Sequence, residues 1–237
     1  MSDIHGNEQA LKAVLDKVRA EYIIDACFLL GDLIDYGMHS NEVISMIKKL
    51  PYPVLCNIRG NHEAAVLSGD TARFSSERGR ECSKYTKSIL SKESWEYLRN
   101  TQENAGLLEF LCCGRRCLAV HGSLEDEYWK SIRPEDELLE YRDYDYVFSG
   151  HSHHPHFVEK YYPAEDEARR NKKKVIFINP GSVGQPRNHN ALAQFVVLDI
   201  ETERVVFDKA PYDIKKEQAS YTGQVDKFYK ERLEAGV

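Results

Sequence analysis

Eight polar residues that can bind metal ions or transfer protons stand at the start of the chain or directly after apolar segments. The segments 23–30, 53–56, 116–120 and 146–148 are typical of buried β-strands. Ligands of α/β proteins collect at the carboxyl ends of strands, so these residues meet if the strands share one orientation. The residues are Asp3, His5, Asp32, Asn61, His62, His121, His151 and His153.

The donor types in this set suit divalent cations. Carboxylate and amide oxygens mixed with imidazole nitrogens are typical ligands of Mn, Fe, Zn, Co or Ni. With His62 set apart, the remaining ligands are too many for one tetrahedral zinc ion and indicate two cations bridged by Asp32. Two cations ~3.5–4 Å apart activate a bridging hydroxide and stabilise its in-line attack on phosphorus. This chemistry predicts the hydrolysis of a phosphate ester.

The order of these residues resembles the calcineurin-like metallophosphoesterase superfamily. The pattern of that superfamily is Asp-x-His, Gly-Asp, Gly-Asn-His-Glu/Asp, a single His and Gly-His-x-His, and all of these blocks occur in order within residues 3–153. Segments 31–44 and 179–187 further resemble small prokaryotic phosphodiesterases and diadenosine tetraphosphatase-like proteins. Segments 211–214 and 232–233 resemble the same branch, so the resemblance covers nearly the whole chain.

The resemblance implies two metal sites that share one carboxylate. One cation would be held by Asp3, His5, Asp32 and His153, and the other by Asp32, Asn61, His121 and His151. Manganese is the first choice for both cations.

The resemblance also implies roles for residues beside the cations. His62 matches the histidine that contacts the phosphate and protonates the leaving oxygen. Glu63 matches the acidic residue that orients this histidine, and Asp35 is a second candidate partner. Arg187 and Asn179 are expected to line the substrate pocket.

The spacing of apolar residues predicts the elements that position this set. Helices are predicted over 8–20, 41–50, 63–68, 77–90, 92–100 and 215–233, and hairpins over 107–120, 157–178 and 194–208. Ser40 or Asn41 is expected to cap the second helix, and residues 124–142 are expected to be charged and partly helical. Together with the resemblance, this order predicts one α/β (α+β) domain over residues 1–237. Its expected architecture is a four-layer α/β/β/α sandwich of two mixed β-sheets flanked by helices.

The start of the chain departs from the superfamily pattern. Only Met1 and Ser2 precede Asp3, whereas superfamily members open with an apolar strand. Either this first strand is truncated, or the start of the chain is assigned too late, or another segment fills its place. We therefore expect neighbouring strands to lack a partner there and the terminus to fray. From this we predict weaker metal binding on the side of Asp3 and His5.

Tyr36 marks a second departure. Protein Ser/Thr phosphatases of the superfamily carry an arginine there, and their His-Gly-Gly differs from His121-Gly122-Ser123 of this chain. These differences disfavour a protein phosphatase without excluding it as an alternative.

The composition limits the classes of partner. A formal net charge of −6 disfavours general nucleic-acid binding. There is no apolar run near the ~20 residues that span a bilayer and no basic-then-apolar start typical of a signal peptide. We expect a cytoplasmic protein that acts on a small phosphate ester or nucleotide, and homo-oligomerisation is left open.

The six cysteines are expected to be reduced. Cys27 and Cys56 fall in predicted buried strands, and a chain of this size does not need disulfides. A zinc site at Cys112, Cys113 and Cys117 would lack a second well-spaced pair, so their role stays open.

These observations predict a dinuclear metal-dependent phosphoesterase that hydrolyses phosphate monoesters or diesters. The alternatives are a diadenosine polyphosphate hydrolase, a protein Ser/Thr phosphatase-like enzyme, and a non-catalytic scaffold with the same fold.

Overall fold

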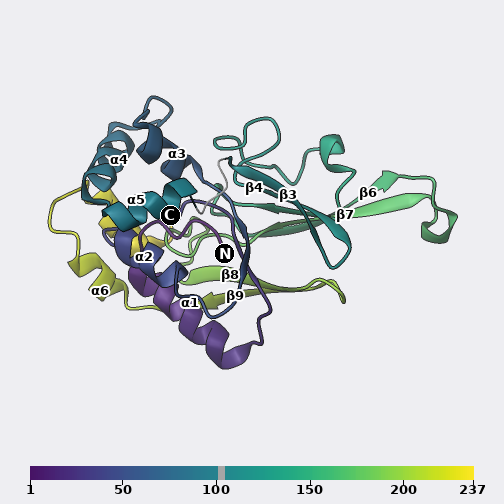
Figure 1. Cartoon of the computed structure of the whole chain (residues 1–237), viewed down its shortest axis with the longest axis horizontal. Coiled ribbons are helices and arrows are strands. Elements are labelled where there is room, and N and C mark those ends of the chain that lie inside the picture. The colour runs from purple at the N-terminus through teal and green to yellow at the C-terminus, as the bar shows by residue number, and fades with distance from the viewer. Residues whose placement is uncertain (101–104) are drawn as a thin grey trace.

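The computed structural model describes residues 1–100 and 105–237 (Figure 1). The α-helices are α1 (Glu8–Glu21), α2 (Ser40–Ile47), α3 (Asn61–Ser68), α4 (Glu77–Ile89), α5 (Lys92–Asn100), α6 (Ile214–Ala219) and α7 (Phe228–Ala235). The strands are β1 (Cys27–Leu29), β2 (Val54–Asn57), β3 (Leu107–Cys112), β4 (Arg115–Val120), β5 (Tyr146–Ser149), β6 (His156–Pro163), β7 (Lys172–Asn179), β8 (Ala193–Asp199) and β9 (Arg204–Ala210). Short 3₁₀ turns cover Leu139–Tyr141 and Glu167–Arg169.

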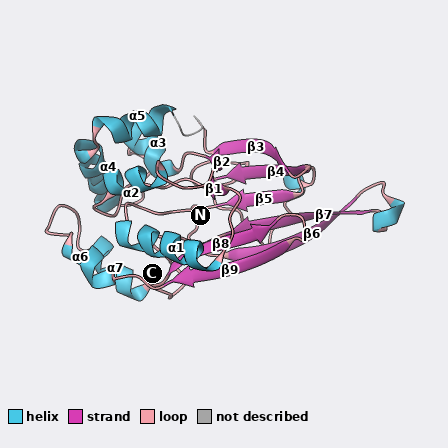
Figure 2. Ribbon diagram, turned by 60° about the horizontal axis from the view of Figure 1, so that its bottom comes forward, coloured by secondary structure: helices cyan, strands magenta, loops and turns pink. Residues whose placement is uncertain are grey.

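The strands form two layers that pack face to face. One layer is a mixed five-stranded sheet in the order β3-β4-β5-β7-β6, and the other contains the parallel pair β1–β2 and the antiparallel pair β8–β9. Apolar side chains of both layers form one buried cluster between them. Figure 2 shows the helices gathered toward one end of the molecule and the β6–β7 hairpin reaching out at the other. The predicted mixed α/β fold is confirmed, and one of its two β layers is split.

The N-terminal segment lies inside the split layer and pairs on both of its sides. The Met1 amino group donates to the Phe28 carbonyl (2.9 Å), and the Asp3 N–H donates to the Gly31 carbonyl (3.1 Å). On the other side, the Val183 N–H donates to the Ser2 carbonyl (3.1 Å). Residues 2–5 are buried. The expectation of a frayed terminus is therefore wrong for residues 1–5.

The expectation that strands next to the chain start lack a partner is confirmed in part. Among the described residues, β1 pairs with β2 alone and β8 with β9 alone. A cavity of about 550 Å³ lies between β1 and β8 and is lined by apolar side chains, including Phe28 and Val197. The predicted strand 23–30 is correspondingly reduced to residues 27–29, and Ile23 is exposed.

Helices α1 and α2 cover the outer face of the split layer. Leu11, Val14 and Ile44 belong to one buried cluster with Leu29 and Phe195 of the strands. The predicted cap of α2 is wrong, because His39 occupies the N-cap position and makes no side-chain capping bond. The hydroxyl of Ser40 instead accepts from the Asp35 N–H (3.2 Å) and so ties α2 to the loop after β1.

The outer face of the five-stranded sheet is covered by mostly irregular chain. Residues 124–142 were expected to be partly helical, but only the 3₁₀ turn 139–141 forms there. Tyr141 from this region and Tyr144 just after it pack in a cluster with Val147 and Phe177 of the sheet. The predicted closing helix 215–233 is interrupted and forms α6 and α7. None of the helices within residues 1–100 and 105–237 is long and apolar enough to cross a membrane.

Candidate dinuclear metal centre

The polar residues that follow the strands converge at one edge of the two layers. Asp32 follows β1, Asn61 follows β2, His121 follows β4, and His151 and His153 follow β5. The pairs β1–β2 and β4–β5 are each parallel, so the carboxyl ends within each pair lie side by side. The N-terminal segment adds Asp3 and His5, and all seven side chains come together as predicted.

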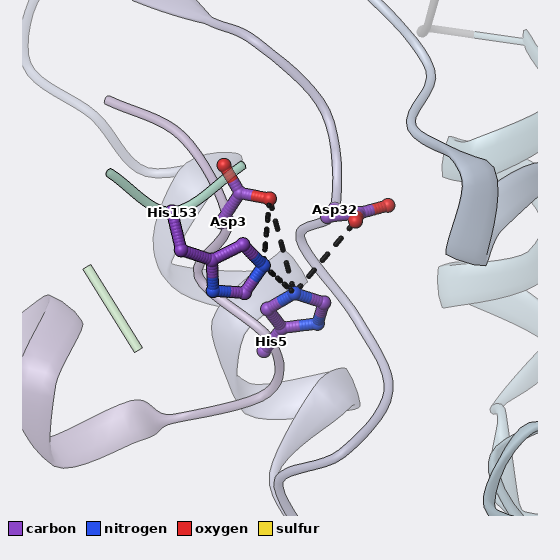
Figure 3. A group of neighbouring side chains, drawn as sticks. All are labelled: Asp3, His5, Asp32 and His153. Carbon is purple, nitrogen blue, oxygen red and sulfur yellow. Dashed lines mark hydrogen bonds and ion pairs between the residues drawn. The ribbon is translucent and has the colours of Figure 1, made fainter. Parts of the chain in front are cut away.

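The first cluster of potential ligands contains Asp3, His5, Asp32 and His153, and we call it the N-terminal half (Figure 3). One potential ligand atom from each residue lies within 4.8 Å of the others. His153 Nε2 is 3.2 Å from Asp3 Oδ1, and His5 Nε2 is 3.7 Å from Asp32 Oδ2. All four side chains are buried.

The second cluster contains Asp32, Asn61, His121 and His151, and we call it the strand-end half. His121 Nε2 lies 3.2 Å from Asp32 Oδ2 and 3.0 Å from Asn61 Oδ1. His151 Nδ1 is also 3.0 Å from Asn61 Oδ1. Asp32 therefore belongs to both halves, which is the position of a bridging carboxylate.

Each of the four histidines directs one ring nitrogen to a backbone carbonyl. The Nδ1 atoms of His5, His121 and His153 lie 3.2, 2.7 and 2.5 Å from carbonyl oxygens, and His151 Nε2 lies 3.2 Å from the carbonyl of Trp129. If these nitrogens carry the ring proton, the other nitrogen of each ring presents a lone pair to the centre. This arrangement is typical of histidines that bind metal ions.

The atoms that face the centre of the site are therefore hydrogen-bond acceptors. Whether a cation fits the site depends on whether these acceptors need a positive charge between them. His5 Nε2 and His153 Nε2 face each other at 3.2 Å, and Asp3 Oδ1 is buried with no hydrogen-bond partner within the described chain. Lone pairs facing at such distances repel unless a proton or a cation lies between them. The residues present fit two divalent cations of the borderline class.

The backbone of the site is strained at the ligands. Five of the seven candidate ligands have positive φ angles between 48° and 63°, in the left-handed region. Such a conformation costs a non-glycine residue on the order of 1–3 kcal/mol and is concentrated at functional sites. The five residues are Asp3, His5, Asp32, His151 and His153.

Glycine permits the closest approach in the site. Gly60 precedes Asn61, and a Cβ atom there would overlap the carboxylate and the backbone of Asp32. Any larger residue would push apart the loops that carry two candidate ligands.

Burial keeps two of the histidines neutral at neutral pH. Desolvation lowers the pKa of both His151 and His153 to about 4. Burial also opposes a charged His121, but the neighbouring Asp32 carboxylate outweighs it and raises the His121 pKa to about 9. A proton and a cation thus compete for His121 Nε2, and metal binding there releases the proton.

His62 lies beside the centre with one ring nitrogen anchored. His62 Nδ1 is 2.6 Å from Asp35 Oδ2, and the Thr86 hydroxyl donates to Asp35 Oδ1 (2.7 Å). Although burial opposes the charged form, the Asp32 and Asp35 carboxylates raise the His62 pKa above its ordinary value. His62 is thereby prepared to hold and donate a proton.

The expected role of Glu63 as the partner of His62 is corrected by these contacts. Its carboxylate accepts the backbone N–H groups of Asp32 (2.9 Å), Leu33 (2.6 Å), Ile34 (3.1 Å) and Gly60 (2.8 Å). Glu63 thus fixes the loop that carries Asp32, and Asp35 orients His62.

Asn179 does not line a substrate pocket, contrary to expectation. It is buried, and its amide donates to the Gly150 carbonyl (2.8 Å) and the Ser152 hydroxyl (3.2 Å) while accepting from the Gly181 N–H (2.9 Å). Asn179 therefore holds the loop on which His151 and His153 stand. Arg187 is partly buried, two residues beyond the Gln185 carbonyl that receives His153 Nδ1.

An aromatic wall beside the site was missed in the sequence. The Phe74 ring lies 4.9 Å from the His62 ring and 5.1 Å from the Trp129 ring, between ring centroids. Arg73 stacks over Trp129 at 5.2 Å. Neither aromatic residue belongs to a motif block, and only the rarity of tryptophan could have drawn attention to Trp129.

Comparison with known proteins supports the geometry. The family model of the calcineurin-like phosphoesterase superfamily domain matches residues 1–203. The uncharacterized protein MJ0912 of Methanocaldococcus jannaschii is 30% identical over 223 residues, which are 91% of this chain and 88% of that protein. The crystal structure of a metallophosphoesterase from Sphaerobacter thermophilus superposes with a TM-score of 0.75 at 27% identity, covering 100% of this chain and 98% of the other.

A shorter segment of the chain is similar to an enzyme whose name states its substrate. A symmetrical bis(5'-nucleosyl)-tetraphosphatase of Baumannia cicadellinicola is 38% identical over 68 residues, which are 29% of this chain and 23% of that enzyme.

Proposed function

Because the chain belongs to the calcineurin-like phosphoesterase superfamily, we propose that it is a dinuclear metal-dependent phosphoesterase that hydrolyses phosphate monoesters or diesters. The observation that carries this proposal is the position of Asp32 in two clusters of inward-facing acceptors. A single cation would leave one cluster without charge compensation. Two cations, for which manganese is our first choice, satisfy both.

The cations, when bound, would supply an activated water nucleophile and neutralise charge on the phosphate. The protein supplies the remaining functions. His62, oriented by Asp35, protonates the leaving oxygen, which contributes on the order of 10²–10⁴-fold to the rate. Glu63 holds the loop that carries Asp32, and Asn179 holds the loop that carries His151 and His153. Burial of the centre strengthens each electrostatic contact.

A nucleotide substrate is a second candidate that the aromatic wall favours. Trp129 is partly exposed, and its ring lies 6.3 Å from the ring of His151. A nucleobase can stack on such a ring at ~1–3 kcal/mol. The short match to a bis(5'-nucleosyl)-tetraphosphatase agrees with this candidate, whereas Tyr36 in place of arginine still disfavours a protein phosphatase.

The proposal is tested by separating catalysis from metal binding. We expect His62→Ala to retain about two Mn²⁺ per chain in metal analysis while kcat for bis-p-nitrophenyl phosphate falls ~10²–10⁴-fold. His189→Ala is the matched control, since His189 is exposed. Unchanged turnover by His62→Ala would remove the acid role from His62.

A screen of Mn, Fe, Zn, Co and Ni with phosphomonoesters, diesters and diadenosine polyphosphates separates the alternatives. A higher kcat/KM for the dinucleotides than for simple diesters would establish the nucleotide candidate. Absence of turnover with every cation would favour the non-catalytic scaffold. The cytoplasmic location and the oligomeric state stay predictions.

A further inference from the structure

A cavity of about 590 Å³ lies where the β3–β4, β6–β7 and β8–β9 hairpins turn, and we call it the hairpin cavity. Arg115 of β4, Lys172 of β7 and Glu203 of the β8–β9 turn all line it. Its floor is the inner face of the five-stranded sheet, where Tyr146 and Ile176 pair across β5 and β7 and are both buried. A cavity of this volume accommodates a small organic ligand.

The hairpin cavity and the metal centre lie at opposite ends of the same strands. Strands β4, β5 and β7 begin beside the cavity, at the end where the β6–β7 hairpin reaches out (Figure 2), and they end beside the metal centre. From Lys172 to Asn179, β7 spans roughly 23 Å, because a strand rises about 3.3 Å per residue. A small ligand in the cavity is therefore a second molecule, separate from a substrate at the metal centre.

The lining of the hairpin cavity is basic although the chain as a whole is acidic. Five of the lining residues are Arg or Lys and two are Asp or Glu, whereas the chain has a formal net charge of −6. Alternation along β7 places Lys172 and Lys174 on the same face as Ile176. This face is apolar at Ile176, which packs between the two β layers, and basic beyond it. A cavity lined in this way attracts an anion.

The two acidic residues of the lining already have partners. Glu203 pairs with Lys174 and, at 3.5 Å, with Arg115. Asp145 lies 3.8 Å from the ammonium group of Lys173. These carboxylates are thus occupied by cations other than those at the tip of the β6–β7 hairpin.

Arg170 and Lys172 at this tip are left without an acidic partner. Within residues 1–100 and 105–237 neither of them forms an ion pair. The tip is closed by backbone hydrogen bonds, from the Ala164 N–H to the Asn171 carbonyl (2.9 Å) and from the Asn171 N–H to the Asp166 carbonyl (2.7 Å). The backbone that carries both cations is therefore fixed beside the cavity. Guanidinium and ammonium groups are the side chains that bind phosphate groups.

An aromatic ring lines the same cavity. Tyr161 of β6 pairs with Lys174 of β7, and its hydroxyl donates to Glu159 (3.1 Å). Tyr161 is nevertheless 56% exposed, so its ring is open to a ligand. Nucleobases stack on such rings. The acidic chain outside the cavity disfavours a long nucleic acid, so cations beside an aromatic ring indicate a single nucleotide.

We propose that the hairpin cavity is a second binding site, which takes a nucleoside phosphate. Arg170 and Lys172 bind its phosphate groups, and Tyr161 stacks on its base. The site is independent of the reaction at the metal centre, because it takes no residue from either cluster of potential ligands.

The test compares a nucleotide with its two parts. α,β-Methylene-ADP, methylenediphosphonate and adenosine are titrated by calorimetry into the full chain freed of metal, so that neither hydrolysis nor bound cations contribute. The wild-type protein should bind α,β-methylene-ADP more tightly than either part. Arg170→Gln and Lys172→Gln should each weaken this binding about 10-fold or more, the loss expected for a hydrogen bond to a charged group. The same site should be found again in the Mn²⁺-loaded protein.

A third variant tests the base. Tyr161→Ala should weaken α,β-methylene-ADP about 5-fold or more, because the stacking contact is lost, and leave methylenediphosphonate unchanged. Lys48→Gln and Arg99→Gln are the matched controls, since both residues are exposed cations on or next to the helices α2 and α5. Neither control should change the affinity for any of the three compounds.

Two results would overturn the proposal. Equal affinity for α,β-methylene-ADP in the wild type, Arg170→Gln and Lys172→Gln would remove the site from the hairpin cavity. Both residues are exposed, so these variants are expected to fold, and circular dichroism checks this. Equal affinity for methylenediphosphonate and the nucleotide, with no effect of Tyr161→Ala, would replace the nucleotide by a bare anion.

Discussion

The two halves of the metal centre share Asp32 but are built differently. The N-terminal half takes Asp3 and His5 from a segment clamped between β1 and residues 183–184, and all of its ligands are buried. The strand-end half takes Asn61 from the start of α3 and His121 and His151 from the loops after β4 and β5, and His151 is partly exposed.

The surroundings of the two halves differ as well. The Tyr36 ring lies 4.5 Å from the His5 ring of the N-terminal half, whereas the Trp129 carbonyl lies 3.2 Å from His151 Nε2 of the strand-end half. Each half therefore has an aromatic residue of its own beside it. The difference teaches that solvent reaches the centre from the side of the strand-end half, because His151 is the candidate ligand that is partly exposed.

The largest effect is expected from removing the residue that the halves share. Asp32→Asn should lower Mn²⁺ content from about two per chain to less than one, because a neutral amide cannot bridge two cations. Turnover should fall more than ~10³-fold, since metal ions contribute several kcal/mol and each 1.4 kcal/mol is tenfold. Metal analysis and initial rates check this, with the exposed Asp16→Asn as control. Full retention of both ions would refute the bridging position.

An intermediate effect is expected at Asn179, which serves both halves by holding the loop of His151 and His153. Asn179→Ala should weaken both steps of a Mn²⁺ titration by about 10–100-fold, as for other residues that support metal ligands. Equilibrium dialysis measures both steps, and Asn100→Ala, at an exposed position of α5, is the control. If instead only KM for the substrate rose, Asn179 would be a pocket residue after all.

The smallest effect is expected at Ser182, which serves the N-terminal half alone. Its hydroxyl donates to the Asp3 carbonyl (2.7 Å) and accepts from the Gln185 N–H (2.8 Å). Ser182→Ala should lower the Mn²⁺ affinity of one binding step about tenfold, because the lost hydrogen bonds contribute roughly 1–1.5 kcal/mol. The exposed Ser88→Ala should change neither step. Equal weakening of both steps would show that the halves are not independent.

The same Mn²⁺ titration tests the expectation that the N-terminal half binds metal more weakly. The binding step whose affinity changes in Ser182→Ala belongs to that half, so the affinities of the two halves can be compared directly. The structure removes frayed backbone as a reason for weakness, because residues 1–5 are hydrogen-bonded and buried. The relative affinity itself stays a prediction.

The sequence by itself determined which residues form the centre. Apolar runs followed at once by Asp, Asn or His mark strand ends, and parallel strands bring their carboxyl ends to one edge whatever the loops between them do. That local rule sufficed for the candidates that follow strands, whereas Asp3 and His5, which no strand precedes, were indicated by the Asp-x-His pattern of the superfamily. The two β layers were predicted from the order of the strands together with the family resemblance, in agreement with the need of strands to cover each other's apolar faces.

Only the tertiary structure decided which neighbour each polar group contacts. Asp35 lies 27 positions before His62 yet orients it, while the adjacent Glu63 turns to the loop after β1. Tyr229 of α7 stacks on Tyr36 of the loop after β1, and no local pattern predicts that contact. Side-chain direction depends on packing between elements distant in the chain, and hydrogen bonds require placement to within a fraction of an ångström. Sequence spacing specifies where strands end, but it does not predict which side chains of distant elements come within hydrogen-bond distance.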